Sequence, residues 1–393
     1  MLQGKNIILG ITGSIAAYKG ADIASKLTQE GALVTVVMTD SATRFVAPLT
    51  YESITGRPVI TSLWQESPGI NHITLAEQAD MVLIAPATAS IIAKTAGGLA
   101  DDLLSCLVLA TKAPVVIAPA MHAAMYENSF TQQNISRLKK HGFYFIEPGE
   151  GRLASGGYGK GRLTDTETIL GTVKWLAGKD GDMSGTKMVI SAGGTREPLD
   201  PVRYIGNYSS GKTGYHLARA ARNRGASVKL ITTADFPDEC VGIEVEKVKT
   251  AEELLRSIKD SVAGSDCLIM AAAVADFKPE TARPAKIKKT STSLEIKLVP
   301  APDILSEVKG EFLRIGFAAE TENLEDNARV KLASKELDMI VANDITGEGA
   351  GFGSDYNRAL LIYRNGSTEE LPLMPKSQMA EKILDAINKL RAG

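Results

Sequence analysis

The feature that most constrains the fold of this 393-residue sequence is a pattern that occurs once in each half. In the first half, NIILGITG is followed by SIAAYKGADIASKLTQEG and LVTVVMT; in the second, MVISAGGT is followed later by GYHLARAARNRG and ASVKLITT. Each set contains a short apolar run, a glycine turn, an amphipathic helical stretch and a second β-branched run. This pattern is typical of two parallel strands joined by a helix. It predicts a parallel sheet in each half.

Further apolar runs extend both predicted sheets. They are MVLIAPAT and PVVIAPAM in the first half, and CLIMAAAV, LRIGFAAE and MIVANDI in the second. Because these runs are apolar on both faces, helices must cover both sides of each sheet. The predicted fold class is therefore α/β, with two doubly wound, Rossmann-like domains of mainly parallel strands. The glycine-rich, charged segment LAGKDGDMSGTK, residues 176–187, marks the expected boundary between a domain at 1–180 and one at 186–393.

Composition and charge argue against several classes of protein. A hydrophobic content of 44% and a charged content of 23% are typical of globular chains. The three cysteines, Cys106, Cys240 and Cys267, share no CxxC spacing, which predicts reduced thiols in a cytoplasmic protein and no zinc site. The formal net charge is −2 and KIKK is the longest basic run, so we expect no nucleic-acid partner. No apolar run approaches the roughly 20 residues of a membrane helix, and the N-terminal run resembles a buried strand more than a signal peptide.

The segment GNYSSGKT, residues 206–213, matches the phosphate-loop pattern GxxxxGK[ST]. A phosphate loop begins directly at the end of a buried strand, whereas here TREPLDPVRYIG follows the strand KMVISAGG. This spacing argues against a nucleotide hydrolase, although CLIMAAAVAD remains a candidate for a magnesium-binding strand. Ser209, Ser210 and Gly211 are expected to open the following helix, whose free amides suit an anion.

The loops that follow the strands of the first half contain candidate ligand contacts, because ligands of open α/β sheets bind beyond the carboxyl ends of strands. GITGSIAAYK lacks the third glycine of a dinucleotide fingerprint, but Gly13 and Ser14 suit one phosphate; a plain glycine turn is the alternative. The loops MTDSATRF, APATASIIAK and APAMHAAMYENS supply small residues and hydroxyls that let a flat ring approach the backbone. Met121 and Met125 would add adaptable apolar walls, with core packing as the alternative.

Five ordered motifs in the first half carry a family resemblance: GSIAAYK, NHITLAEQADMVLIAPATA, GGLADDLL, PAMHxxMY and LASGGYGKGRL. Together they resemble the flavin-dependent decarboxylases of cysteine-ended peptides, and in particular the phosphopantothenoylcysteine decarboxylase half of the bifunctional enzymes of bacterial coenzyme A synthesis. The resemblance implies bound FMN, oxidation of the substrate thiol to a thioaldehyde, loss of the carboxylate and reduction of the resulting enethiol. The FMN contacts that it implies are Gly13, Ser14, Ile15, Thr39, Ser41, Pro86, Thr88, Ala89 and Ser105.

The same resemblance assigns catalytic and substrate-binding residues in the first half. His72 occupies the position of the family's catalytic histidine, and Met121, His122 and Met125 stand in its substrate-binding motif. His122 replaces the asparagine of that motif, and it can still donate a hydrogen bond to a carboxylate. Ser155 stands where the family's flexible clamp carries a cysteine as proton donor. Since a hydroxyl is a much weaker acid than a thiol, the identity of the proton donor stays open.

A second set of ordered motifs covers the second half: GGTREPLDPVRYIGNYSSGKTG, AAAVADFKP, KIKK, PDIL, GFAAET and VANDI. These resemble the phosphopantothenate–cysteine ligase half of the same enzymes. The resemblance implies that phosphopantothenate attacks the α-phosphate of CTP to give an acyl cytidylate, from which the cysteine amine displaces CMP. Asn207 would hold the acyl cytidylate, and Lys286 would stabilise the charge at phosphorus. The implied CTP contacts are Met270, Ala271, Ala272, Asp276, Lys286, Pro302, Asp303, Ile304, Leu305, Phe317, Lys331 and Lys335.

Several expectations about the second half and the assembly remain. Lys331 and Lys335 lie one helical turn apart and can gather a triphosphate, with a solvated helix face as the alternative. Mg²⁺ is expected with CTP, and Asp276 could contact the ribose, the base or the metal. Residues 280–299 predict a basic flap and a hairpin arm.

The resemblance further implies homo-oligomers, with trimers of decarboxylase halves and dimers of ligase halves. It does not decide whether the first half is active. One alternative is an active ligase with a non-catalytic first half, and another is a first half that acts as a regulatory subunit.

Overall fold

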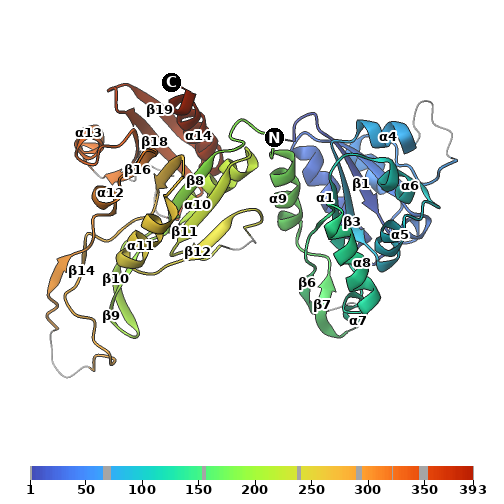
Figure 1. The fold of residues 1–393 in the computed structure, drawn as a ribbon, viewed down its shortest axis with the longest axis horizontal. Coiled ribbons are helices and arrows are strands. Elements are labelled where there is room, and N and C mark those ends of the chain that lie inside the picture. Colours follow the sequence, from blue (N-terminus) through green and yellow to red (C-terminus); the bar gives the residue numbers. More distant parts are fainter. Residues whose placement is uncertain are drawn as a thin grey trace. The chain divides into compact units, whose positions relative to one another are not determined.

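The computed structural model describes residues 2–64, 72–152, 156–236, 240–288, 294–320, 322–344 and 353–392. The chain divides into two compact units, Met1–Ala177 and Gly178–Gly393, and each is described by itself (Figure 1). Both units contain a mainly parallel sheet covered by helices on its two faces. This architecture confirms the predicted α/β fold class.

The first unit is built on a sheet whose strands are all parallel. In order across the sheet they are β2 (Leu33–Met38), β1 (Asn6–Ile11), β3 (Met81–Ala87), β4 (Val115–Pro119) and β5 (Tyr144–Phe145). Alternate side chains of β1 point to opposite faces, so Ile7 and Leu9 join one hydrophobic cluster while Ile8 joins another. A separate hairpin pairs β6 (Gly149–Arg152) with β7 (Tyr158–Arg162).

Helices cover both faces of this sheet (Figure 1). One face packs against α1 (Ala17–Gln29), α3 (Pro48–Thr55) and α9 (Thr166–Ala177). The other packs against α4 (His72–Gln78), α5 (Ala89–Gly97), α6 (Leu103–Ala110) and α8 (Ser129–Lys140). Two short helices, α2 (Asp40–Thr43) and α7 (Ala123–Tyr126), lie in the loops after β2 and β4. The loops that carry the predicted ligand contacts are therefore mounted on a rigid three-layer scaffold.

The second unit contains a larger, mixed sheet. In order its strands are β12 (Glu244–Lys247), β11 (Ser227–Thr232), β8 (Lys187–Ala192), β13 (Cys267–Met270), β16 (Leu313–Glu320), β17 (Met339–Asp344), β18 (Tyr356–Tyr363) and β19 (Thr368–Pro375). All neighbouring pairs from β12 to β17 are parallel, whereas β18 and β19 pair antiparallel. The helices are α10 (Lys212–Asn223) and α14 (Lys376–Ala392) on one face, and α11 (Ala251–Ser261), α12 (Ile304–Glu307) and α13 (Leu324–Ser334) on the other. Among the described helices of the chain, none is long and apolar enough to cross a membrane.

Two small hairpins interrupt the alternation of strands and helices in the second unit. The first pairs β9 (Arg196–Asp200) with β10 (Arg203–Gly206) and stands between β8 and α10. GNYSSGKT therefore follows a hairpin instead of a buried strand, which removes the geometry of a phosphate loop. The second pairs β14 (Phe277–Pro279) with β15 (Leu298–Pro300), in the region of the expected hairpin arm; residues 289–293 of the expected flap lie outside the described residues.

The segment between the two units packs onto the second one. Met183 is fully buried and belongs to the same hydrophobic cluster as Met188 of β8. Arg224 donates to Asp182 through Nε at 2.9 Å, and Thr186 is fully buried. The glycine and charge content of this segment thus does not keep it solvated along its whole length.

Candidate active sites

A cavity of about 1060 Å³ lies at the carboxyl ends of the parallel strands in the first unit. Its walls come mainly from the loops that follow β1, β2, β3 and β4, and residues of the β6–β7 hairpin complete them. The chain passes from β1 to β2 on one side and later to β3 on the other, and ligands of open α/β sheets bind at such a switch point. The predicted residues that line this cavity are Gly13, Ser14, Ile15, Thr39, Ser41, Thr88, Ala89, Met121, His122 and Met125.

The residues of this cavity fit a flat cofactor with polar edges. A Cβ atom on Gly13 would lie 2.5 Å from the Cβ of Ser41, so the loops after β1 and β2 approach as closely as glycine allows. The hydroxyl Oγ1 of Thr39 is buried and has no hydrogen-bond partner among the described residues. A buried hydroxyl at the wall of a cavity is a suitable contact for a bound polar group. The close approach of the loops at Gly13 and the Thr39 hydroxyl, unpaired within the described part of the chain, therefore suit a flavin, which has a flat ring with polar edges.

Two predicted FMN contacts, Pro86 and Ser105, do not line the cavity. The carbonyl of Pro86 accepts a hydrogen bond from Thr12 Oγ1 at 2.7 Å, and the same hydroxyl accepts from the backbone N–H of Thr88 at 3.0 Å. Ser105 is buried and forms a capping box with Asp102 at the start of α6. Both residues lie behind the wall and hold the loops that form it.

The predicted catalytic residues of the first unit lie apart from this cavity or outside the described residues. His72 is the first residue of α4, is half-buried and is not among the lining residues. Ser155 lies outside the described residues. His122 does line the cavity, and its Nδ1 accepts a hydrogen bond from the backbone N–H of Ala124 at 3.2 Å. This leaves Nε2 of His122 as the candidate contact to substrate.

Several charged residues that the sequence analysis did not single out also line this cavity. Lys94 donates to Asp101 at 2.7 Å and to Asp102 at 2.9 Å, and these hydrogen bonds raise its pKa. Lys19 donates to the carbonyl of Leu163 at 3.2 Å, and burial lowers its pKa. Four of them stand in motifs or loops that the sequence analysis quoted, but only the fold shows that these separated segments meet at one cavity: Lys19, Lys94, Asp102, Arg152 and Arg162.

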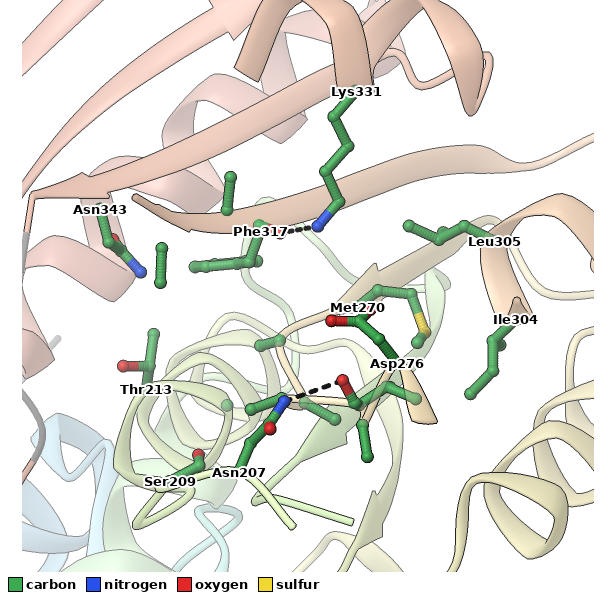
Figure 2. A pocket seen from close by; sticks show the side chains of 18 of the residues that line it. Asn207, Ser209, Thr213, Met270, Asp276, Ile304, Leu305, Phe317, Lys331 and Asn343 are labelled. Carbon is green, nitrogen blue, oxygen red and sulfur yellow. Dashed lines mark hydrogen bonds between the residues drawn. The ribbon is translucent and has the colours of Figure 1, made fainter. Parts of the chain in front are cut away.

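The second unit contains a cavity of similar size, about 1060 Å³ (Figure 2). Its walls combine the segment before α10, the segments that follow β13 and β15, the carboxyl-terminal half of β16, and the helices α12 and α13. Asn207 lines it. The predicted CTP contacts that line it are Met270, Ala271, Ala272, Asp276, Pro302, Asp303, Ile304, Leu305, Phe317, Lys331 and Lys335.

Two polar side chains project into this cavity from facing walls (Figure 2). Asn207 donates from Nδ2 to the carbonyl of Val274 at 2.9 Å, which orients its amide beside the loop after β13. Lys331 donates from Nζ to the carbonyl of Phe317 in β16 at 2.9 Å. The space between them is therefore bounded by an amide on one side and an ammonium group on the other.

A second cation, Lys335, meets a carboxylate at the same wall. Lys335 donates to Asp303, which also caps the N-terminus of α12, and to Ser306 Oγ at 3.1 Å. Partial burial favours the protonated acid, but hydrogen bonds from Lys335 and Ser306 hold the pKa of Asp303 below its ordinary value. The Asp303 carboxylate therefore stays ionised at neutral pH, and a bound phosphate would compete with it for Lys335.

Lys286, the remaining predicted catalytic residue, is exposed and does not line the cavity. Its neighbour Ile287 donates its backbone N–H to Asp200 at 3.0 Å and accepts from Arg203 at 3.1 Å. These contacts fasten the segment that carries Lys286 to the β9–β10 hairpin.

The far end of the chain supplies cavity residues that sequence reasoning missed. Lys376, the first residue of α14, is buried and donates to the carbonyl of Ser354 at 2.6 Å; burial lowers its pKa, as does nearby Lys212. Asn357 of β18 is also buried at this wall. Lys212, the lysine of GNYSSGKT, donates to Asp355 at 2.7 Å. Among the described residues, no group of three or more His, Cys, Asp or Glu is arranged to hold a metal ion.

Comparison with known proteins matches each unit to a family. The Flavoprotein family model matches residues 1–177, and the model for the DNA/pantothenate metabolism flavoprotein C-terminal domain matches residues 183–390. Among solved structures, the C-terminal domain of a coenzyme A biosynthesis bifunctional protein CoaBC is 34% identical, covers 54% of this chain and 98% of its own, and has a TM-score of 0.47. A PPC decarboxylase variant complexed with pantothenoylaminoethenethiol is 32% identical, covers 44% of this chain and 97% of its own, and has a TM-score of 0.40.

Full-length relatives share both halves in the same order. The coenzyme A biosynthesis bifunctional protein CoaBC of Bacillus subtilis (strain 168) is 44% identical over 99% of this chain and 98% of its own. The protein of the same description from Mycobacterium bovis is 40% identical over 99% of this chain and 97% of its own. These matches confirm the resemblance of both motif sets. The chain belongs to the CoaBC family, the bifunctional enzymes of coenzyme A biosynthesis in which a flavoprotein decarboxylase half precedes a ligase half.

Proposed function

We propose that this chain makes 4′-phosphopantetheine from 4′-phosphopantothenate, cysteine and CTP, with the second unit forming the amide and the first unit removing the carboxylate. The observation that supports this most is the composition of the second cavity. It contains Asn207 and every predicted CTP contact except Lys286, drawn from segments that are far apart in the sequence. If these residues had no common role, they would be expected at scattered places in the unit and not around one cavity.

Ligation would proceed in two displacements. The carboxylate of phosphopantothenate attacks the α-phosphorus of CTP, and pyrophosphate leaves. The amine of cysteine then attacks the acyl carbon, CMP leaves and the amine loses a proton. Lys331 and Lys335 lie at the cavity wall where they can neutralise the triphosphate, together with Mg²⁺. Asn207, on the facing wall, would hold the acyl cytidylate by hydrogen bonds.

The start of α10 suits the 4′-phosphate of the substrate. Ser209, Ser210 and Thr213 line the cavity beside the amides that open this helix, and helix N-termini bind phosphates through such amides. Lys212 and Lys376 add positive charge at the same wall. GNYSSGKT would then bind a substrate phosphate without being a hydrolase loop.

The first cavity would bind FMN and the cysteinyl end of the ligation product. FMN would supply the two-electron oxidation of the substrate and the matching reduction, so the overall decarboxylation is redox-neutral. Met121 and Met125 would enclose the substrate, and His122 would donate a hydrogen bond to its carboxylate. Ser155 stands at the position of the clamp's proton donor. It would donate the proton for reduction of the enethiol, either directly or through a water molecule.

The two predicted catalytic residues that lie away from the cavities support an oligomeric enzyme. Neither His72 nor Lys286 lines the cavity of its own unit. In decarboxylase trimers and ligase dimers, each would be available to the cavity of a neighbouring chain. We propose these assemblies, and a cytoplasmic location, for this protein.

The test uses the purified full-length protein with CTP, phosphopantothenate, cysteine and Mg²⁺. We expect a yellow protein that releases pyrophosphate only when CTP and phosphopantothenate are both present, and carbon dioxide once cysteine is added. Synthetic phosphopantothenoylcysteine tests the first unit alone. If the protein releases pyrophosphate from CTP but no carbon dioxide from phosphopantothenoylcysteine, the first unit is non-catalytic. A colourless protein that releases neither pyrophosphate nor carbon dioxide would contradict the proposal.

A further inference from the structure

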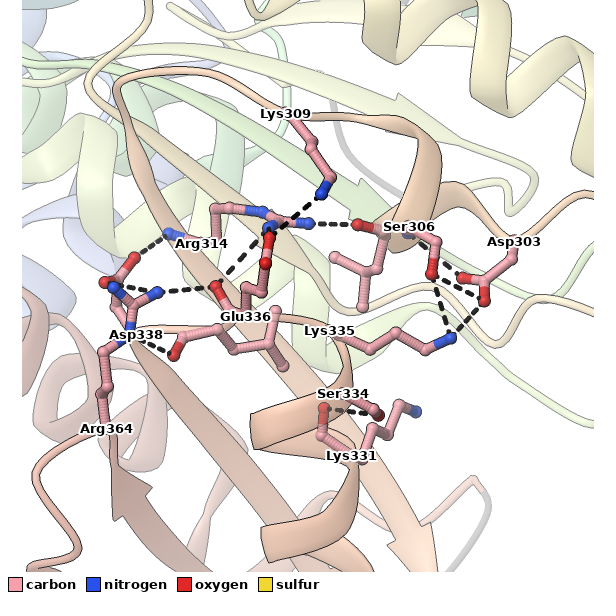
Figure 3. Close-up of polar contacts among 12 residues, drawn as sticks. Asp303, Ser306, Lys309, Arg314, Lys331, Ser334, Lys335, Glu336, Asp338 and Arg364 are labelled. Atoms are coloured by element: carbon pink, nitrogen blue, oxygen red, sulfur yellow. Dashed lines mark hydrogen bonds and ion pairs between the residues drawn. The ribbon is translucent and has the colours of Figure 1, made fainter.

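A buried arginine lies directly behind the wall of the second cavity that α12 and α13 form (Figure 3). Arg314 is the second residue of β16, and its side chain is only 7% exposed. Its backbone N–H donates to Asp338 at 2.8 Å, which fixes the start of the strand. Arg314 does not line the cavity and has no role in the two displacements of the proposed ligation.

The guanidinium of Arg314 joins two segments of the cavity wall. Its Nη2 donates to the carbonyl of Leu305 in α12. Its Nη1 lies 3.5 Å from the carbonyl of Glu336, just after α13, and 3.8 Å from the carboxylate of the same residue. Since a guanidinium is planar and rigid, the two contacts set the spacing between α12 and the end of α13.

The same two segments are joined a second time on the cavity side, by the contacts of Lys335 with Asp303 and Ser306 (Figure 3). Asp303 precedes Leu305 by two residues, and Lys335 directly precedes Glu336. The two links therefore act on the same pair of segments from opposite sides. A nucleotide phosphate would compete with Asp303 for Lys335, so the front link would weaken on binding while the link through Arg314 would persist.

The turn that follows α13 needs support because of its backbone conformation. Glu336 has a φ of +52°, a left-handed conformation that costs a residue with a Cβ on the order of 1 kcal/mol. Arg364 donates to the Glu336 carbonyl at 2.6 Å and to the Leu337 carbonyl at 3.0 Å. The contacts of Arg364 stabilise the turn alone, whereas Arg314 contacts both the turn and, through the Leu305 carbonyl, α12.

We propose that Arg314 is a positioning residue for nucleotide binding, which holds α12 and the end of α13 at the spacing that lets Lys335 and Lys331 meet the phosphates of CTP. This inference rests on the proposed function of the second cavity. The Nε of Arg314 is buried without a hydrogen-bond partner among the described residues, so the cost of burying this charge offsets part of the stabilisation that its other contacts give. Replacing it with an apolar side chain of similar length should therefore affect nucleotide binding more than folding.

The test compares Arg314→Met and Arg314→Lys with the unchanged full-length protein. Initial rates of pyrophosphate release are measured against CTP at saturating phosphopantothenate and cysteine, and isothermal titration measures the Kd of CTP alone. For Arg314→Met we expect KM and Kd for CTP to rise about tenfold, the effect of losing one well-placed charged contact, while kcat and the KM for phosphopantothenate change less than about twofold. Arg314→Lys keeps the charge and should give an intermediate KM for CTP.

Lys309→Met is the matched control. Lys309 lies two residues after α12 and also pairs with Glu336, at 3.2 Å, so it joins the same two segments as Arg314, but both side chains of this pair are about two-thirds exposed. This variant should leave the KM for CTP unchanged. If Arg314→Met is active and its KM for CTP is unchanged, the positioning role is wrong. It is also wrong if Arg314→Met has a lowered Tm and its kcat and its KM for both substrates all worsen together. If the unchanged protein releases no pyrophosphate from CTP, the proposed function fails and this inference with it.

Discussion

At the scale of single residues, Asn207 and Lys212 lie five positions apart in GNYSSGKT but have different surroundings. Asn207 donates to the Val274 carbonyl at 2.9 Å inside the cavity, whereas Lys212 is already paired with Asp355 at 2.7 Å. We therefore expect Asn207→Ala to lower kcat/KM for ligation by about 100-fold or more, because a hydrogen bond that orients the reacting intermediate is lost. Lys212→Ala should lower it by less than about tenfold.

The measurement is CTP-dependent pyrophosphate release at varied phosphopantothenate. Asn207→Asp is the conservative partner, since it keeps the side-chain volume and removes the donor to Val274. If Lys212→Ala were the more damaging change, Lys212 would bind the triphosphate of CTP as the lysine of a phosphate loop does, and the hydrolase-like interpretation of this segment would return.

At the scale of elements, a polar network ties α7 to the β6–β7 hairpin in the first unit. Tyr126 of α7 donates to the carboxylate of Glu147 at 2.9 Å, and Lys160 of β7 donates to the same carboxylate at 2.9 Å. Lys139 of α8 donates to it at 3.1 Å. The network joins the end of the substrate-binding motif to the hairpin whose two strands flank Ser155.

Removing the Tyr126 hydroxyl should loosen this junction. We expect Tyr126→Phe to lower the free energy of unfolding of the first unit by about 1 kcal/mol, the net contribution of one hydrogen bond. Both tryptophans, Trp64 and Trp175, lie in the first unit, and Trp175 packs edge-on against Tyr144 at 6.2 Å. Urea unfolding followed by tryptophan fluorescence therefore reports this unit alone. Tyr158→Phe is a suitable control, since Tyr158 is 75% exposed on the same hairpin.

The pH dependence of this variant follows from Glu147. Partial burial favours its protonated form, but hydrogen bonds from Lys160, Tyr126 and Lys139 prevail and lower its pKa to about 2. A carboxylate with a depressed folded-state pKa stabilises the fold above its unfolded value, near 4.3, and loses that contribution as the pH falls toward about 2. The difference between Tyr126→Phe and the unchanged protein should thus be constant from pH 8 to pH 5 and shrink below pH 4. A difference that grows on acidification would contradict the role of the ionised carboxylate.

The elements also show what sequence patterns could and could not predict. The buried parallel strands were predictable because each is a run of apolar residues that ends in a small-residue loop. The antiparallel strands β18 and β19 were missed, although Asn365 and Gly366 between them form an NG turn signal that follows the apolar run ALLIY. Pairings such as Arg314 with Leu305 leave no local pattern, because they join segments that only the completed fold brings together. The same applies to Lys376, which reaches the second cavity from the last helix.

At the scale of the whole molecule, each unit has hydrophobic clusters of its own, and the segment between the units belongs to the second. The glycine and charge content of this segment predicted a domain boundary there, but composition does not report a single buried side chain. Met183 is 0% exposed and packs in the hydrophobic cluster that contains Met188 and Leu217. Replacing such a side chain with alanine removes apolar contacts and leaves a cavity.

We expect Met183→Ala to lower the free energy of unfolding of the second unit by about 3 kcal/mol, in the range for buried methionine. The first unit should be unaffected, because Met183 lies in none of its clusters. In urea, the loss of far-UV circular dichroism should therefore begin at lower concentration while the tryptophan-detected transition keeps its midpoint. Met374→Ala, a half-buried neighbour of the same cluster, should have a smaller effect. A shift of the tryptophan midpoint that matches the circular dichroism shift would show that the two units unfold as one, and that the segment from Gly178 to Thr186 couples them instead of belonging to the second alone.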